Sequence, residues 1–355
     1  MKKLVAILLV LAMAVACCAC GGSTAQAPAA SAPAASSSTP AAPAASTPAS
    51  PANPQVTLKW SCSESEDSVF GMAMKAAFEE VTEKTNGDVT FEYYYSNALG
   101  TIPEFMEQML SGSPIICSGG IDTISEYCNN IMPAAFPYTY KDINEIFALQ
   151  KSTWWEDAKV AMAGEHIAPV ALGASGYRHF VGKLKVEKAD DLKGHIVRMG
   201  PASMAQTFMS VVGASPTTTT WSDNYSLIQN GGIELCEASV DLLWSSSLQE
   251  VSDYLNLSGH FITPFIISMN DQCFASLGEE YQQILCDAVD AQCQTMVDKA
   301  LAAQDEYVQK FKDYGVEVVE TDKDSFAPYL PKLYDALGFD TAEYDKLRAA
   351  IEAAK

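Results

Sequence analysis

The sequence has half as many basic residues as acidic ones, and this imbalance excludes several kinds of partner. Its 355 residues include 22 Lys and Arg against 44 Asp and Glu, which gives a formal net charge of −22. So acidic a surface repels the phosphates of nucleic acids and the head groups of anionic membranes. An anion can bind such a chain only where local positive groups overcome the average field.

The sequence also lacks the motifs of common enzyme classes. It contains no G-x-x-x-x-G-K-[ST] phosphate-binding loop and no H-E-x-x-H zinc motif. The four histidines show no metal-ligand spacing. The segment around Ser175 is one residue short of a nucleophile elbow. We therefore predict no enzyme activity, no catalytic residues, no metal site and no cofactor.

Cysteine patterns give no support for disulfides in the main part of the chain. Seven cysteines follow residue 54 and none of them has C-x-x-C spacing: Cys62, Cys117, Cys128, Cys236, Cys273, Cys286 and Cys293. Cys286 and Cys293 lie in one predicted helix, about 10 Å apart, which is too far for a disulfide. We predict that these cysteines serve as small buried hydrophobic residues.

The N-terminus has the pattern of an exported lipoprotein. Lys2 and Lys3 precede an apolar stretch, 4–16, that is too short to span a bilayer, so residues 1–19 are predicted to be a signal peptide. Ala19-Cys20-Gly21 resembles a bacterial lipobox and predicts lipidation of Cys20, with Cys17 as a second candidate. This places the protein on the outer face of the bacterial cell membrane. Ordinary cleavage with release of a soluble protein is the alternative.

Residues 20–54 are predicted to form a tether. From residue 21 onward the segment is almost entirely Ala, Pro, Ser and Thr, with no charged residue. It cannot bury enough apolar surface to fold, and its prolines favour an extended chain.

From residue 56 onward, patterns typical of strands and helices alternate, which predicts an α/β fold with largely parallel sheets. Strands are predicted at 56–62, 88–95, 114–118, 168–174 and 316–319. Helices are predicted from a cap at Asp67 or Ser68 to Thr85, and at 103–110 and 142–165. A longer helix is predicted over 278–314, with Gly315 ending it. At 1.5 Å per residue it would be about 55 Å long, enough to lie along two lobes.

Two arginines are the strongest candidates for ligand contact. Arg178 and Arg198 stand twenty positions apart, each beside a predicted strand, and Arg198 follows the turn and strand of Gly194-His195-Ile196-Val197. A guanidinium on a rigid strand suits a carboxylate, because its planar fork donates two parallel hydrogen bonds and keeps its proton. Arg178 could instead pair with an acid such as Glu237 and brace the site.

The order of several short motifs resembles the solute-binding subunit of a tripartite ATP-independent periplasmic (TRAP) transporter, the DctP-like family. The resemblance extends from Val56 to about Ala336 and rests on these landmarks: Asn97-Ala98-Leu99-Gly100, Gly176-Tyr177-Arg178, Asp191-Leu192-Lys193-Gly194 before Arg198, Gly213-Ala214-Ser215-Pro216, Trp221-Ser222-Asp223-Asn224-Tyr225 and Leu227-Ile228-Gln229-Asn230-Gly231-Gly232.

This resemblance implies a two-lobed periplasmic-binding-protein (Venus flytrap) fold that closes on a ligand, with the long helix spanning both lobes. We assign residues 55–175 and 264–303 to the first lobe, and 176–263 and 304–355 to the second. The resemblance also implies that the ligand is a small organic anion, most simply a carboxylate, and that the partner is a TRAP-type membrane permease. A ligand-sensing subunit of a receptor and an anchored hydrolase are the alternatives.

The resemblance also implies roles for individual residues. Arg198 would bind the carboxylate, Arg178 would assist, and Trp221 would pack against the ligand. Ser61 and Ser118 would line the other lobe, while Glu237 and Tyr225 would support the site from behind. Two positions depart from the family pattern: Ala238 stands where an asparagine often helps to hold the carboxylate, and Asp223 where a glutamate is common.

Overall fold

A computed structural model describes residues 55–200 and 202–355 of the chain. The predicted signal peptide (1–19), the predicted tether (20–54) and both candidate lipid sites, Cys17 and Cys20, lie outside these residues. Across the described residues, no helix is long and apolar enough to cross a membrane.

The first sheet has five strands in the order β2-β1-β3-β10-β4. In β1, Leu58 and Trp60 are fully buried while Thr57 and Lys59 are exposed, which is the period-two pattern of a strand with one buried face. β1 pairs in parallel with β2 and β3, whereas β10 runs antiparallel to β3 and β4. The strands are β1 (Val56–Ser61), β2 (Val89–Tyr94), β3 (Ile115–Gly120), β4 (Ile167–Ala174) and β10 (Pro264–Asn270).

The second sheet has six strands in the order β11-β9-β5-β8-β6-β7. β6 pairs in parallel with β7 and β8, and β9 with β11, while β5 runs antiparallel to both of its neighbours. The strands are β5 (Arg178–Gly182), β6 (Ile196–Arg198), β7 (Ser215–Thr217), β8 (Leu235–Ala238), β9 (Tyr254–Phe261) and β11 (Glu317–Val319).

Two short segments connect the sheets and explain why the sheets are mixed rather than largely parallel. The chain leaves the first sheet through β4 and enters the second as β5; it returns through β9 and β10. Each returning strand therefore runs opposite to the departing strand beside it. The connections touch each other, since the Ser175 N–H donates to the Thr263 carbonyl at 3.2 Å. Gly176 between β4 and β5 has φ +117°, a conformation that glycine adopts without strain.

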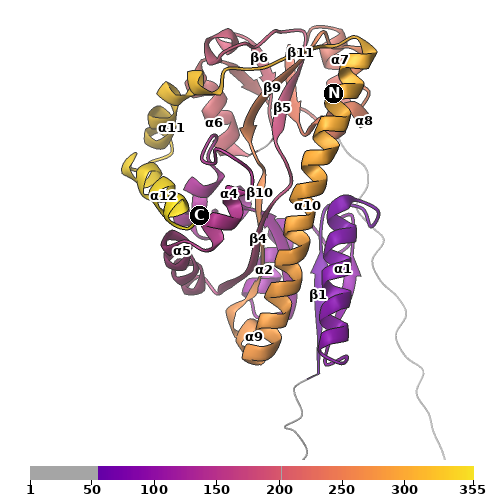
Figure 1. Cartoon of the computed structure of the whole chain (residues 1–355), viewed down its shortest axis with the longest axis vertical. Helices are drawn as coiled ribbons and strands as arrows, with labels where there is room; N and C mark the ends of the chain where they lie inside the picture. Colours follow the sequence, from indigo (N-terminus) through magenta and orange to yellow (C-terminus); the bar gives the residue numbers. More distant parts are fainter. Residues whose placement is uncertain (1–54, 201) are drawn as a thin grey trace, which may run out of the picture. The chain divides into compact units, whose positions relative to one another are not determined.

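The predicted long helix is confirmed with the predicted bounds. α10 (Gly278–Tyr314) contacts α1 (Val69–Lys84) and β4 on the side of the first sheet, and α8 (Val240–Ser245) and β11 on the side of the second (Figure 1). Its buried side chains include Leu285, Val289, Met296 and Phe311. Gly315, with φ +104°, ends the helix in the left-handed conformation.

The prediction of one helix over 142–165 is wrong. Two helices, α4 (Glu145–Gln150) and α5 (Thr153–Gly164), occupy this range. The break occurs because the Ser152 side chain accepts a hydrogen bond from the Trp155 N–H at 3.2 Å and caps a new helix. The other α-helices are α2 (Ile102–Leu110), α3 (Ile121–Ile124), α6 (Ser203–Val212), α7 (Asn224–Gln229), α9 (Asp271–Ser276), α11 (Leu330–Ala336) and α12 (Ala342–Ala353), and the 3-10 helices include η1 (Asn129–Ala135) and η5 (Lys323–Tyr329).

The C-terminal helix α12 packs against η1, α4 and α5. Its buried Arg348 donates to Glu145 of α4, and the Lys355 Nζ lies 2.6 Å from the same carboxylate. Residues 342–353 therefore contact helices of the range assigned above to the first lobe, although 304–355 were assigned to the second. The lobe boundaries stay a prediction.

The cysteines largely behave as predicted. All seven in the described residues are free, and five of them are buried: Cys62, Cys117, Cys128, Cys236 and Cys293. Burial raises the pKa of Cys117 and of Cys236 to about 12, so these thiols stay protonated at neutral pH. Cys273 and Cys286 are only partly buried.

Candidate ligand-binding site

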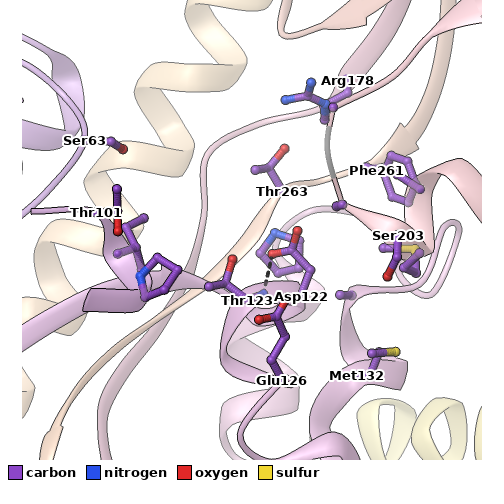
Figure 2. A pocket seen from close by; sticks show the side chains of 18 of the residues that line it. Ser63, Thr101, Asp122, Thr123, Glu126, Met132, Arg178, Ser203, Phe261 and Thr263 are labelled. Carbon is purple, nitrogen blue, oxygen red and sulfur yellow. Dashed lines mark hydrogen bonds between the residues drawn. The ribbon is translucent and has the colours of Figure 1, made fainter. Parts of the chain in front are cut away.

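A cavity of about 670 Å³ is lined by residues from both sheets and the helices beside them (Figure 2). Its lining consists of Ser63, Asn97, Thr101, Ile102, Pro103, Asp122, Thr123, Glu126, Met132, Ala135, Arg178, Gly200, Ala202, Ser203, Met204, Ala205, Glu237, Phe261, Thr263 and Pro264. The volume is that of a typical small-molecule site.

Arg178 begins β5 and places a guanidinium at this cavity. Its Nε donates to Oε2 of Glu237 at 2.5 Å, and its Nη2 donates to Oε1 of the same residue at 2.9 Å. Nη2 also donates to the Glu237 carbonyl at 3.2 Å. Nη1 has no hydrogen-bond partner among the described residues. The pairing considered from the sequence is therefore present, and one nitrogen of the fork remains available to a ligand.

Glu237 is almost completely buried behind Arg178. Burial by itself raises the pKa of its carboxyl and is the largest single effect, but the charge and hydrogen bonds of Arg178, together with the nearby His260, outweigh it and hold the pKa at about 2. The His260 Nε2 lies 3.7 Å from the Glu237 Oε2, and the His260 ring stacks on Phe180 with centroids 4.2 Å apart. Glu237 is thus a permanent anion that fixes the Arg178 side chain.

Two buried histidines lie next to this ion pair. Gly259 N–H donates to Nδ1 of His179 at 3.1 Å, and Nε2 of His179 lies 3.0 Å from Oε1 of Gln304. Burial lowers the pKa of His179 to about 3, despite the hydrogen bond with Gln304. Burial also lowers the pKa of His260, although Glu237 opposes that shift.

We expect the free energy of unfolding to fall as the pH is lowered from about 6.5. Unfolded His179 takes up a proton near pH 6.5, whereas folded His179 stays neutral to about pH 3, so the unfolded state binds more protons in this window. From pH 6.5 to 5 this residue alone removes roughly 2 kcal/mol. Urea unfolding of wild type and His179→Gln at both pH values measures the effect. The exposed His166→Gln serves as control, and an unchanged pH dependence in His179→Gln would contradict the expectation.

Arg198 ends β6 and is only 7% exposed. Its Nη2 donates to the Thr219 carbonyl at 3.0 Å, and its guanidinium carbon lies 5.1 Å from the Trp221 ring centroid. Nε of Arg198 is buried, and no described residue forms a hydrogen bond with it. The Trp221 Nε1 donates to the Ser246 hydroxyl at 3.0 Å, which fixes the indole. The structure thus brings Arg198 and Trp221 together, but neither is among the residues that line the cavity.

The strand register places the two arginines on either side of β8. Arg198 pairs with Cys236 of β8, and His179, next to Arg178, pairs with Ala238. Strands that flank a common neighbour are about 10 Å apart. Both arginines therefore lie on inner strands of the second sheet, toward the C-terminal end of β8, with Glu237 of β8 between their strands.

The remaining predicted residues lie outside the cavity lining. Ser118 of β3 is buried and accepts a hydrogen bond from the Trp60 Nε1 at 2.9 Å. Ser61, at the end of β1, is also buried, whereas Ser63 two positions later lines the cavity. The Tyr225 hydroxyl donates to Glu250 at 3.0 Å, and Ala238 is buried in β8.

Several polar residues of the cavity were not predicted. Asp122, Thr123 and Glu126 follow β3 directly, while Asn97 and Thr101 lie between β2 and α2. Their position after a strand is the signal that could have identified them, because residues that follow strands can line a site at the ends of those strands. Gly119-Gly120 ends one strand, and Asn97-Ala98-Leu99-Gly100 follows another. No group of three or more His, Cys, Asp or Glu within 55–200 and 202–355 is arranged to hold a metal ion.

Residues 61–337 match the protein family described as bacterial extracellular solute-binding protein, family 7 (DctP). The chain belongs to this family. The match covers more than three quarters of the chain and includes every element that contributes to the cavity. The resemblance to DctP-like solute-binding proteins is therefore confirmed.

Two named relatives of this family 7 protein are 21% and 24% identical to it over the aligned residues. The 2,3-diketo-L-gulonate-binding periplasmic protein YiaO of Escherichia coli K12 is 24% identical over 293 residues, covering 79% of this chain and 84% of YiaO. The sialic acid-binding periplasmic protein SiaP of Vibrio cholerae is 21% identical over 287 residues, covering 79% and 88%.

Solved structures of TRAP periplasmic solute-binding proteins share the fold of this family 7 protein. An apo open structure from Escherichia fergusonii gives a TM-score of 0.76 at 22% identity, covering 83% of this chain and 99% of that one. A structure from Chromohalobacter salexigens with bound D-glucuronate gives 0.72 at 22% identity, covering 84% and 100%. The predicted two-lobed α/β fold is confirmed.

Proposed function

We propose that this solute-binding protein captures a small organic acid outside the cytoplasm and delivers it to a TRAP-type membrane permease. The observation that carries the proposal is a small-molecule-sized cavity, lined from both sheets, with the Arg178 guanidinium in its wall. The names of YiaO and SiaP and the D-glucuronate of the Chromohalobacter structure all refer to carboxylic acids, which supports a carboxylate as the ligand. Its role is binding, with no catalytic step.

In this proposal the ligand carboxylate is held by Arg198 and Arg178. Nε of Arg198 and Nη1 of Arg178 supply donors that no residue of 55–200 or 202–355 satisfies. A buried donor without a partner is costly, so a carboxylate that fills this role gains affinity. Trp221 packs beside the ligand, while Ser61 and Ser118 support the opposite wall of the site. Glu237 and Tyr225 do not contact the ligand but hold the residues that do.

Closure of two lobes would strengthen these contacts. The lobes proposed are residues 55–175 with 264–303, and 176–263 with 304–355. A ligand that contacts both lobes stabilises the closed form by its differential affinity for it. Expulsion of water lowers the local dielectric, and the attraction between guanidinium and carboxylate increases.

A thermal-shift screen of small organic acids against their uncharged alcohol analogues tests this function. Because a ligand that binds the native state stabilises it, at least one acid should raise the melting temperature, while its alcohol should not. Equal shifts from acid and alcohol, or no shift from any acid, would contradict the proposal.

We further propose that the mature protein is anchored to the outer face of the cell membrane through a lipid on Cys20. Full-length protein expressed in bacteria should incorporate labelled palmitate, and Cys20→Ser should abolish the label. Cys17→Ser is the matched control and should label normally. If only Cys17→Ser loses the label, the lipid is attached to Cys17. If wild type is not labelled, the proposed lipid anchor is wrong.

A further inference from the structure

The cavity contains more negative than positive charge. Among the described residues that line it, Asp122, Glu126 and Glu237 carry carboxylates, and Arg178 carries the one positive charge. Glu237 already binds Arg178 through two hydrogen bonds. Neither Asp122 nor Glu126 forms an ion pair within the described part of the chain. The cavity therefore holds two carboxylates without an ion-pair partner, a half-buried Asp122 and an exposed Glu126. The charge of Asp122 reaches Arg178 and contributes to the raised pKa of that guanidinium, but Glu237 already neutralises Arg178.

These two carboxylates belong to one short segment. Asp122 lies in α3, and Glu126 lies four positions later in the turn that follows this helix. In Figure 2 Asp122 lies between Arg178 at the top of the view and Glu126 below. The Asp122 Oδ1 accepts from the Thr123 N–H at 2.9 Å, which leaves Oδ2 without a partner among the described residues. Gly120 permits this position, because a Cβ there would lie 2.2 Å from the Asp122 Oδ1.

Adding Arg198 does not restore the balance. Arg178 and Arg198 then face three carboxylates, and the carboxylate of a bound acid would add a fourth negative charge. Loss of water on closure strengthens repulsion between like charges as much as it strengthens attraction. Hydroxyl groups on a ligand could donate hydrogen bonds to Asp122 and Glu126, but they would leave the charge uncompensated.

We propose that the solute is a zwitterion, in which a carboxylate faces the arginines and an ammonium group faces Asp122 and Glu126. The inference rests on the proposed function, since it assigns a second charge to the same acid. Apolar side chains line the same cavity, among them Met132, Met204 and Phe261. The class of ligand is therefore a small amino acid with an apolar portion.

Matched pairs of probes test this inference. Each amino acid is compared with the hydroxy acid of the same carbon skeleton, as in leucine and 2-hydroxyisocaproate, phenylalanine and phenyllactate, or 4-aminobutyrate and 4-hydroxybutyrate. Affinities are measured by calorimetry on wild type, Asp122→Asn and Glu126→Gln. Asp122→Asn keeps the oxygen that binds the Thr123 N–H, and Asp157→Asn, an exposed acid outside the cavity, controls for net charge.

In at least one pair, wild type should bind the amino acid ten times more tightly than the hydroxy acid or better. Asp122→Asn should reduce that preference at least tenfold without weakening the binding of the hydroxy acid, because loss of a carboxylate lowers the repulsion that the acid meets. Asp157→Asn should leave both affinities unchanged. The zwitterion proposal is wrong if the hydroxy acids bind as tightly as the matching amino acids, or if neither cavity variant changes the preference. In both cases the proposal that the protein binds a carboxylic acid still stands. Binding of no acid of either kind would overturn both.

Discussion

Arg178→Met should lower the free energy of unfolding by about 3 kcal/mol, because it leaves a buried carboxylate without its counter-ion. Glu237 has a side chain only 3% exposed and stays ionised because Arg178, with a further contribution from His260, holds its pKa at about 2. A quarter of the Arg178 side chain is exposed, which places the loss at the low end of values for broken buried pairs. Urea unfolding at pH 7 measures it.

Two comparisons separate the ion pair from lost packing. The double variant Arg178→Met/Glu237→Gln should recover at least half of the stability, since the uncompensated charge is gone. Lys183→Met breaks the exposed pair with Asp253 in the same part of the fold and should cost less than about 0.5 kcal/mol. A double variant no more stable than Arg178→Met would show that electrostatics is not the cause.

Arg198→Ala should weaken the affinity for the acid found in the screen by about a hundredfold, or roughly 3 kcal/mol. The loss should exceed that of Arg198→Lys, about tenfold, because lysine keeps the charge but lacks the planar fork. Calorimetric titration measures both. Lys188 is an exposed lysine outside the cavity, so Lys188→Ala should bind the acid like wild type. Wild-type affinity in Arg198→Ala would show that Arg198 does not contact the ligand.

Parts of the fold could be predicted because the signals were local. The helix over 278–314 lacks proline, carries periodic apolar residues and ends at a glycine, so its bounds follow from the sequence. The break at Ser152 was missed because serine is tolerated inside helices, and only its hydrogen bond to Trp155 marks it as a cap. The antiparallel β5 and β10 depend on where the chain crosses between the sheets, which no local pattern encodes.

The candidate site, like the fold, could be predicted only in part from the sequence. Arg178 and its partner Glu237 could be proposed from strand position and charge, and both line the cavity. Arg198 and Trp221 were each predicted as ligand contacts from the resemblance, and that role stays a prediction. Their contacts with each other, with Thr219 and with Ser246 depend on tertiary packing, which the sequence does not show. Asp122 and Glu126 were missed because acidic residues after a strand are common in so acidic a chain. Their position in the same cavity as Arg178 is what identifies them as candidate ligand contacts.

A crystal structure with the organic acid that gives the largest thermal shift would test carboxylate capture most directly. The carboxylate should lie in the cavity within hydrogen-bonding distance of the Arg198 or Arg178 guanidinium, with the ligand in contact with residues of both sheets. A ligand bound elsewhere, or one whose carboxylate meets neither arginine, would contradict the proposed function.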